Sequence, residues 1–251
     1  MDWLPLLQEL ADAADAISTR YFRRSDLPVE RKPDRSLVTA ADLEVESAMR
    51  DIVARRHPEL GVFGEEQGEH HGSSGSRLIV DPIDATANFA RGLPIYATLL
   101  AIEAEGEIVA GMVTAPALHQ RWHAARGQGA FAGTRPLRVS RVASMADAQV
   151  FHGSLAGAEA VPGTERIPGL LQQSWRQRGV GDFWQHLLVA EGCGEIAIDP
   201  VVKPWDIAPL QVIVEEAGGL ATTVQGERSI YGGSLLCTNG VLHATALAAF
   251  A

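Results

Sequence analysis

The second half of the chain alternates apolar runs with amphipathic stretches, and this alternation constrains the fold more than any other feature. In order it predicts strand 148–152, helix 164–177, strand 178–181, helix 182–192, strand 195–199, helix 206–217, strands 219–224 and 234–238, and helix 240–250. Such alternation is typical of a sheet covered by helices. The second half is therefore expected to be an α/β unit.

The first half has a different pattern. Helices are expected over 3–23 and 40–56, and strands over 77–81, 94–104 and 107–115. The charged, proline-containing stretch 25–36 is expected to be a mobile loop, and 67–76 a polar loop. No repeat or low-complexity linker separates the halves. The sequence thus predicts an α+β subdomain, 1–144, that shares an interface with an α/β subdomain, 145–251.

Composition excludes several classes of protein. The 251 residues are 46% hydrophobic and carry a formal charge of −10, as in many globular proteins. With no basic run, nucleic acid is not an expected partner. No apolar stretch reaches the length of about 18 residues that a membrane span needs, and Met1-Asp2-Trp3 lacks the basic start of a signal peptide. Cys193 and Cys237 are expected as buried thiols in a reducing compartment, which favours a cytoplasmic protein.

One short segment combines features of a cation site and an anion site. Asp81 and Asp84 lie three residues apart behind the apolar run 78–80, with a proline expected to form a turn between them. Hard divalent cations need such anionic oxygens close together. The residues after Asp84 could begin a helix, whose free N–H groups attract anions. The segment therefore favours phosphate chemistry, although a turn followed by a helix cap is an equal alternative.

Three further acidic segments have both a structural and a functional interpretation. Glu65 and Glu66 follow a short apolar run and a glycine, which fits either a site at a strand end or a solvated acidic loop. Asp206 is expected to be the N-cap of helix 206–217, a position from which a carboxylate can also face a cleft. Asp42 completes a capping box with Thr39.

Together these segments resemble the inositol monophosphatase family. Residues 38–42, 64–66, 81–89 and 205–206 follow the order and approximate spacing of that family, and the resemblance extends to 215–219 and 238–240. Within the family, 115–118, 122–131 and 181–183 are most similar to histidinol-phosphate phosphatases of the actinobacterial type. The resemblance implies a layered αβαβα sandwich and a homodimer.

The resemblance also implies two to three Mg²⁺ ions in each active site. Glu65, Asp81 and the carbonyl of Ile83 would hold one ion, and Asp81, Asp84 and Asp206 a second, while a weaker third ion would share Glu65. These are oxygen ligands of the kind that Mg²⁺ prefers.

Catalytic roles follow from the same resemblance. Glu65 and Thr86 would orient a metal-activated water and help to deprotonate it, with Asp42 holding Thr86. The backbone N–H groups of Ala85 and Thr86 would receive the phosphate. The family usually has glycine at position 85, and this chain also has alanine at position 87, where relatives often have a longer or basic residue. Because the metal ligands are unchanged, activity is expected to persist.

The expected reaction is Mg²⁺-dependent hydrolysis of L-histidinol phosphate to L-histidinol and phosphate. Asp182 is the candidate for contact with the cationic part of this small metabolite, unless it only caps helix 182–192, and Arg178 is a second candidate substrate contact. Hydrolysis of inositol-1-phosphate or another small phosphomonoester is the alternative within the family. An inactive regulatory homologue is the alternative outside enzymes.

Overall fold

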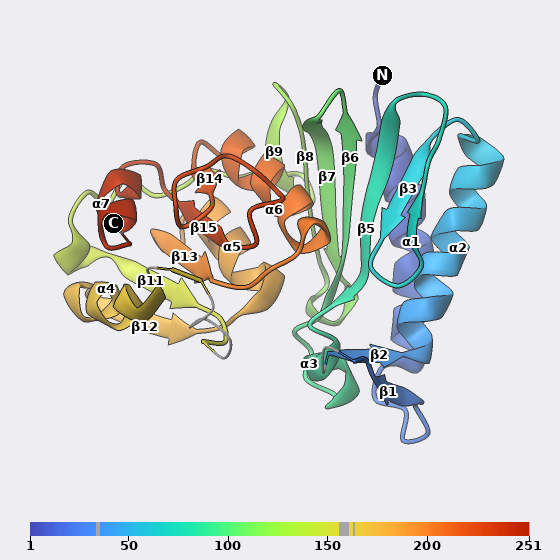
Figure 1. Ribbon diagram of the computed structural model, residues 1–251, viewed down its shortest axis with the longest axis horizontal. Helices are drawn as coiled ribbons and strands as arrows, with labels where there is room; N and C mark the ends of the chain where they lie inside the picture. Colours follow the sequence, from blue (N-terminus) through green and yellow to red (C-terminus); the bar gives the residue numbers. More distant parts are fainter. Residues whose placement is uncertain (34–35, 156–160, 163, 251) are drawn as a thin grey trace.

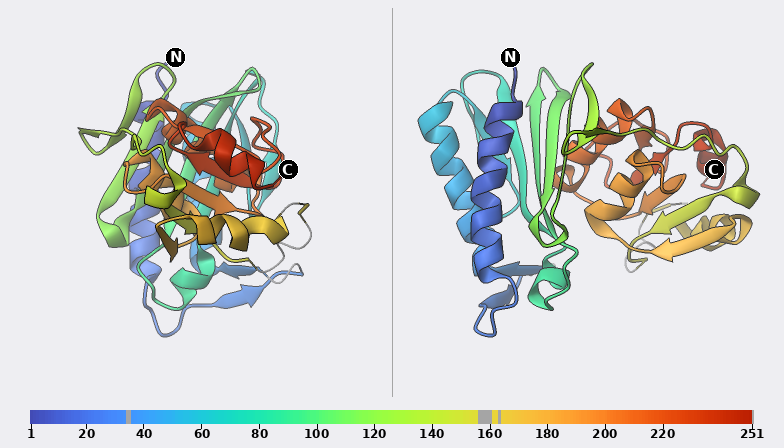
Figure 2. Two further views of the ribbon diagram at one scale, coloured as in Figure 1. Left: turned by 90° about the vertical axis from the view of Figure 1, so that its left-hand side faces the viewer. Right: turned by 180° about the vertical axis from the view of Figure 1, so that it is seen from behind.

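The structure is a computed structural model that describes residues 1–33, 36–155, 161–162 and 164–250. Its layers run α, β, α, β, α along the long axis (Figure 1). Helices α1 and α2 cover the outer face of a large sheet, α5 and α6 lie between the two sheets, and α4 and α7 cover the far face of the smaller sheet (Figure 2). The predicted αβαβα sandwich is confirmed.

Helices make up the first, third and fifth layers, apart from the short α3 beside the site. Their bounds are α1 Leu4–Tyr21, α2 Ala40–Arg56, α3 Thr86–Ala90, α4 Ile167–Gln173, α5 Asp182–Ala190, α6 Pro204–Glu216 and α7 His243–Ala248. None of the described helices is long and apolar enough to span a bilayer.

The larger sheet has eight strands in the order β10-β9-β8-β7-β6-β5-β3-β4. Its strands are β3 Gly61–Gly64, β4 Gly68–His70, β5 Ser76–Asp84, β6 Ala97–Ala104, β7 Glu107–Ala115, β8 Gln120–Ala125, β9 Gly129–Ala132 and β10 Arg135–Pro136. Only the β3–β5 pair is parallel. A separate pair, β1 Val29–Arg31 and β2 Leu37–Thr39, lies near α3 (Figure 1).

The smaller sheet has five strands in the order β12-β11-β13-β15-β14. They are β11 Gln149–His152, β12 Arg176–Gly179, β13 Ile196–Asp199, β14 Leu220–Thr222 and β15 Leu235–Thr238. Strand β11 pairs parallel with both β12 and β13, and β15 pairs antiparallel with β13 and β14.

Strand β5 shows why the large sheet is buried on both faces. Successive side chains of a strand point to opposite faces. Leu78 and Val80 belong to the core under α1 and α2, whereas Ile79 belongs to the core that contains the apolar face of α6. Helix α6 approaches closely because Gly111 of β7 has no side chain, and a Cβ there would lie 2.7 Å from Val212. The two sheets thus share α6.

Several sequence-based boundaries are wrong. The stretch 25–36, expected as a mobile loop, contains β1, which pairs with β2. The loop expected over 67–76 contains β4. Strand β5 continues through the expected turn at Pro82 to Asp84, with a register irregularity between Asp81 and Asp84. Long-range pairing overrides local turn propensity at these places.

Two further corrections concern the second half. The helix expected over 164–177 is a 3₁₀ turn, Thr164–Arg166, followed by α4, and Arg176 and Gln177 belong to β12. Trp175, inside the range expected to be helical, is 61% exposed. Cys237 is buried as expected, but Cys193 is exposed.

Candidate functional site

The irregular end of β5 brings two carboxylates to one place. In a regular strand, residues 81 and 84 would face opposite sides of the sheet because their separation is odd. The register shift between Asp81 and Asp84 removes that restriction. Carboxylate oxygens of Asp81, Asp84 and Asp206 lie within 4.8 Å of one another. This group is the candidate metal centre.

Asp206 reaches the group from the first turn of α6. The N-cap of this helix is Lys203, so the predicted assignment of Asp206 as N-cap is wrong. Asp206 Oδ2 instead accepts a hydrogen bond of 2.8 Å from the backbone N–H of Lys203. That bond leaves the other carboxylate oxygen without a role in the cap, so one side chain can serve both the helix and the site.

Crowding and burial make this carboxylate group electrostatically unfavourable by itself. Burial, and then the charges of Glu65 and Asp84, raise the pKa of Asp81 well above its ordinary value. Burial likewise raises the pKa of Asp206 to about 7. Asp81 Oδ1 is buried with no hydrogen-bond partner among the described residues. An unpartnered buried acceptor among oxygen donors fits a divalent cation such as Mg²⁺.

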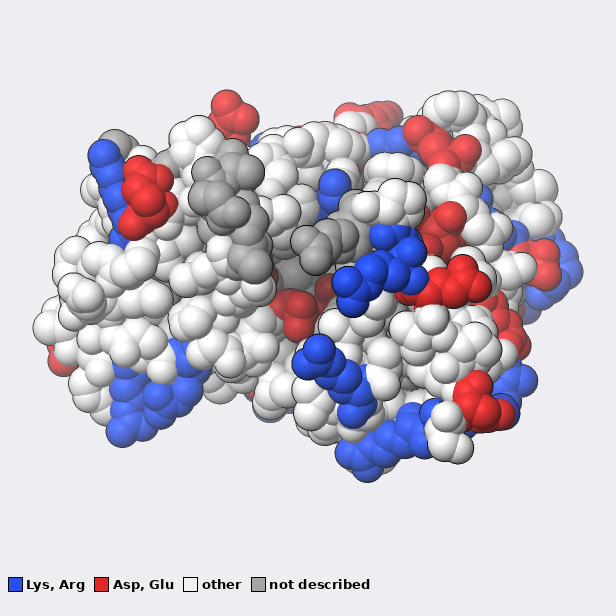
Figure 3. Space-filling view, turned by 60° about the horizontal axis from the view of Figure 1, so that its bottom comes forward, with Lys and Arg blue, Asp and Glu red and all other residues white. Residues whose placement is uncertain are grey.

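A cavity of about 370 Å³ opens on this group. Its lining is Lys32, Ser36, Glu65, Asp81, Ile83, Asp84, Ala85, Thr86, Lys203, Trp205 and Asp206. Figure 3 shows acidic side chains in a hollow in the middle of one face of the molecule, beside basic ones. The structure thus brings Glu65, Asp81, Ile83, Asp84, Ala85, Thr86 and Asp206 together, as predicted from the sequence.

Glu65 is held by a lysine that sequence reasoning missed. Lys32 Nζ lies 2.9 Å from Glu65 Oε1 and 2.6 Å from Glu66 Oε1. The stretch 25–36 therefore contributes two side chains, Lys32 and Ser36, to the cavity. Burial raises the pKa of Glu66 to about 7. The tight carboxylate group does not include Glu65.

Glu46, also missed, supports the segment that carries Glu65. Its carboxylate is fully buried on α2 and accepts hydrogen bonds from the backbone N–H groups of Glu66 and Gln67, at 2.8 and 3.1 Å. Arg50 donates to the same carboxylate. The only sequence signal was the i,i+4 spacing of Glu46 and Arg50, which is equally typical of a solvated helix face.

Thr86 and Asp42 meet as the resemblance implied. Thr86 Oγ1 donates to Ile83 O at 2.9 Å and lies 3.3 Å from Asp42 Oδ1. The other oxygen of Asp42 accepts from Thr39 in the predicted capping box. Burial raises the pKa of Asp42 to about 6. Ala85 precedes Thr86 with φ 64°, a left-handed conformation that favours glycine.

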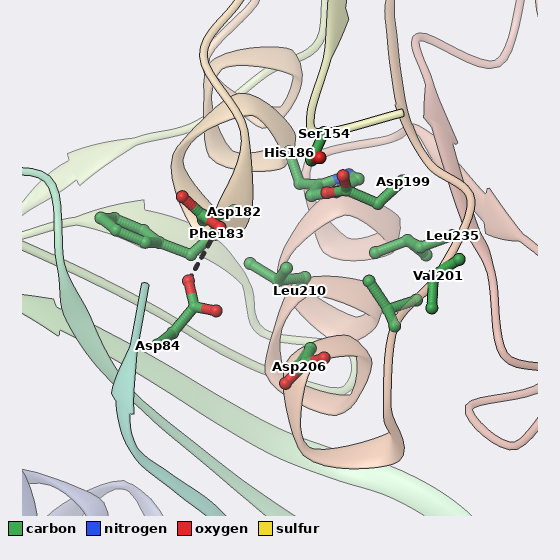
Figure 4. A pocket seen from close by; sticks show the side chains of 11 residues that line it. Asp84, Ser154, Asp182, Phe183, His186, Asp199, Val201, Asp206, Leu210 and Leu235 are labelled. Carbon is green, nitrogen blue, oxygen red and sulfur yellow. Dashed lines mark hydrogen bonds and ion pairs between the residues drawn. The ribbon is translucent and has the colours of Figure 1, made fainter. Parts of the chain in front are cut away.

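A second cavity, of about 240 Å³, adjoins the first because Asp84 and Asp206 line both. The further lining residues are Ser154, Asp182, Phe183, His186, Asp199, Val201, Val202, Leu210 and Leu235. Figure 4 shows Asp84 and Asp206 on one side and the pair His186 and Asp199 on another. The backbone N–H of Phe183 donates to Asp84 Oδ2 at 2.9 Å, and this bond links the start of α5 to the end of β5.

Asp182 is placed in this second cavity by a strained backbone. It begins α5 with φ 53°, directly after Gly181 at φ 79°. The N-cap of α5 is Gly181 and makes no side-chain cap bond, so the alternative that Asp182 only caps the helix is wrong. The side chain of Asp182 instead accepts a hydrogen bond of 3.3 Å from Asn88. Burial and the charge of Asp199 raise the pKa of Asp182 to about 6. Left-handed backbone at a non-glycine residue is typical of functional positions.

Arg178 is not brought to either cavity. It lies exposed on the edge strand β12, where Nη1 donates to the backbone carbonyl of Gln177. Arg178 is not among the described residues that line the two cavities. Asp199 occupies the second cavity instead, and sequence reasoning did not select it. Its position at the end of an apolar strand was the one available signal.

Known proteins match this chain over nearly its whole length. The model of the inositol monophosphatase family matches residues 2–251. A histidinol-phosphatase of Mycobacterium tuberculosis is 47% identical over 96% of this chain and 95% of its own length. A histidinol-phosphatase of Streptomyces coelicolor is 39% identical over 97% and 94%. The structure of a Thermotoga maritima IMPase superposes with a TM-score of 0.90 and 29% identity, covering 100% of this chain and 97% of that one. This chain belongs to the inositol monophosphatase family.

Proposed function

We propose that the protein is a Mg²⁺-dependent phosphomonoesterase that hydrolyses L-histidinol phosphate to L-histidinol and phosphate. The observation that carries this proposal is the junction of two cavities, one with the crowded carboxylates and one with two further carboxylates, Asp182 and Asp199. The first suits a cation–phosphate complex, and the second suits a cationic leaving alcohol. The names of the two bacterial relatives support the choice of substrate.

Two to three magnesium ions would be held by the side chains that the first cavity collects. Asp81, Asp84 and Asp206 offer carboxylate oxygens, and Glu65 and the carbonyl of Ile83 offer further ones. When bound, Mg²⁺ polarises phosphate oxygens and lowers the pKa of coordinated water. Asp81 Oδ1, which lacks a hydrogen-bond partner among the described residues, supports this assignment.

The chain's own groups would position the water and the phosphate. The Thr86 hydroxyl is fixed between Ile83 O and Asp42 and can hold a water for attack. Glu65, in the same cavity, is the candidate to receive its proton. The backbone N–H groups of Ala85 and Thr86 would donate to the phosphate, because α3 begins there.

The second cavity would hold the amine and imidazole of the substrate. Asp182 and Asp199 supply negative charge, and Val202, Leu210 and Leu235 supply an apolar wall. A neutral polyol would gain no ion pair from either carboxylate, so the cavity favours a cationic alcohol.

Phosphate release from L-histidinol phosphate and from inositol-1-phosphate, each with Mg²⁺ and with EDTA, tests the proposal. We expect Mg²⁺-dependent release, with kcat/KM at least about tenfold higher for histidinol phosphate, since one ion pair of this kind contributes about 1.5–3 kcal/mol. Equal values for the two substrates would contradict the substrate assignment. A folded protein with no phosphatase activity would favour a regulatory role.

We further infer a cytoplasmic homodimer. Both cysteines are free, which is compatible with a reducing compartment. Trp175, 61% exposed beside the edge strand β12, is the kind of side chain that an interface covers. Light scattering coupled to size exclusion would give the mass in solution, against 26.8 kDa for one chain.

A further inference from the structure

A buried polar cluster forms part of the wall of the second cavity. Asp199 Oδ2 accepts from His186 Nε2 at 3.0 Å and also from Gln185 Nε2. Gln185 Nε2 donates in addition to the backbone carbonyl of Ile198, at 3.2 Å. Gln185 and His186 are 0% and 1% exposed and Asp199 is 8% exposed, and of the three His186 and Asp199 line the cavity. Two neighbouring residues of α5 therefore hold one oxygen of a carboxylate at the end of β13. Figure 4 shows one of them, His186, beside Asp199.

The two ring nitrogens of His186 have different surroundings. Nδ1 is buried and has no hydrogen-bond partner among the described residues. An imidazolium would place an N–H donor there without an acceptor, which is costly in a buried site. The neutral tautomer with its proton on Nε2 leaves only an unpaired acceptor at Nδ1 and still donates to Asp199. Because Gln185 is neutral too, these two donors orient Asp199 without compensating its charge.

Glu65 of the first cavity shows the opposite arrangement. Its carboxylate lies 2.9 Å from the ammonium group of Lys32, so its charge is compensated within the chain. No Lys or Arg ion pair is found for Asp199 among the described residues. The carboxylate of Asp199 is thus oriented by neutral donors and remains available to a cation from outside.

The backbone opposite also makes room for this orientation. Gly153, directly after β11, faces Asp199 Oδ1 so closely that a Cβ at position 153 would collide with that oxygen. Gly153 is not among the glycines with positive φ, so the backbone itself would accept alanine. The space, and not the backbone conformation, requires glycine here.

We propose that His186 is a positioning residue for substrate selectivity: with Gln185 it orients Asp199 toward the cationic part of the substrate, in the space that Gly153 leaves free. This inference rests on the proposed function. It assigns to His186 no contact with phosphate, metal or the reacting atoms. Its loss should therefore change selection between substrates and leave the chemical step nearly unchanged.

Four variants test the proposal by kcat and KM on L-histidinol phosphate and inositol-1-phosphate. His186→Leu removes the donor, whereas His186→Gln can place an amide N–H near the Nε2 position. We expect His186→Leu to raise KM for histidinol phosphate about tenfold, the loss of one charge-assisted hydrogen bond, with kcat and the inositol-1-phosphate constants within about twofold. His186→Gln should recover most of the loss. Gly153→Ala, which keeps both donors but displaces Asp199, should reproduce His186→Leu.

His243→Leu is the matched control, since His243 is also buried but bonds to Thr238 and Thr222 away from both cavities. It should change stability without changing selectivity. Equal losses on both substrates for His186→Leu, or no recovery in a folded His186→Gln, would overturn the positioning role. A wild-type protein without preference for histidinol phosphate would overturn the proposed function, and this inference with it. A wild-type preference that persists in His186→Leu would overturn the inference alone.

Discussion

The two cavities treat their carboxylates in opposite ways. In the first, Asp81, Asp84 and Asp206 crowd within 4.8 Å of one another, so each disfavours the charge of the next. In the second, Asp199 is held by neutral donors and Asp182 by an amide. Crowded carboxylates suit ions of high charge density, and single oriented ones suit an organic cation. The comparison predicts that substitutions in the first cavity lower kcat on every substrate. Substitutions in the second cavity should change the preference for one substrate over another.

The largest effect is expected for Asp84→Asn. Loss of a charged ligand from the crowded group should lower kcat on the order of 10³-fold on every substrate, because stabilisation of charge in the transition state is lost. The melting temperature without metal should stay unchanged or rise, since burial and neighbouring charges disfavour the ionised form. Asp147→Asn, at an exposed position, is the control. Substantial residual turnover would remove Asp84 from the metal site.

The next effect is a pH-dependent stability that Mg²⁺ suppresses. Asp206 has a folded pKa of about 7 against an ordinary value of 3.8, so between these values the folded state binds more protons than the unfolded chain. Without metal, the melting temperature should therefore fall as pH rises from about 4 to about 7. Mg²⁺ at 100 times Kd should add about 2.7 kcal/mol to the free energy of unfolding and so raise the melting temperature. Calorimetry at pH 5 and pH 8, with EDTA or Mg²⁺, measures both. If the melting temperature in EDTA is the same at pH 5 and pH 8, the argument from crowded carboxylates is wrong.

Asp182→Asn should act on selection. Removing one charge from the second cavity should raise KM for L-histidinol phosphate about tenfold, the value of one charge-assisted contact. Inositol-1-phosphate kinetics should change by less than about twofold. Asp51→Asn, on the exposed face of α2, serves as control. If both substrates lose activity together, Asp182 supports Asp84 and does not select the substrate.

The smallest effect concerns Ala85→Gly, at the border of the first cavity. Glycine removes the strain of the left-handed conformation at φ 64°, which stabilises the folded state. The larger entropy of the unfolded glycine chain offsets part of this, so the free energy of unfolding should rise by less than about 1 kcal/mol. Ala87→Gly, inside α3, should instead destabilise by about 0.5–1 kcal/mol. Thermal unfolding of both variants separates a strained position from an ordinary helical one. A destabilised Ala85→Gly would show that the strain argument is wrong.

The first cavity was largely predictable because its determinants are local. The capping box of Thr39 and Asp42 forms as expected, and Asp81 and Asp84 come from one strand. The second cavity was predicted only at Asp182, because His186 and Asp199 follow no motif that spacing reveals. Arg178 illustrates the limit, since it lies only four residues before Asp182 in the sequence but β12 places it on the exposed edge.

The sequence by itself determined many of the helices and strands, because periodicity and helix capping depend on near neighbours, and its motifs determined the family, whose resemblance implied the layered fold and the carboxylates of the candidate metal centre. Only the tertiary structure decided which partner each carboxylate has. Lys32 reaches Glu65 across 33 residues, and Phe183 donates to Asp84 across 99. Such pairs depend on how sheets and helices pack, and so the charge state and orientation of each carboxylate were settled by contacts that no local pattern encodes.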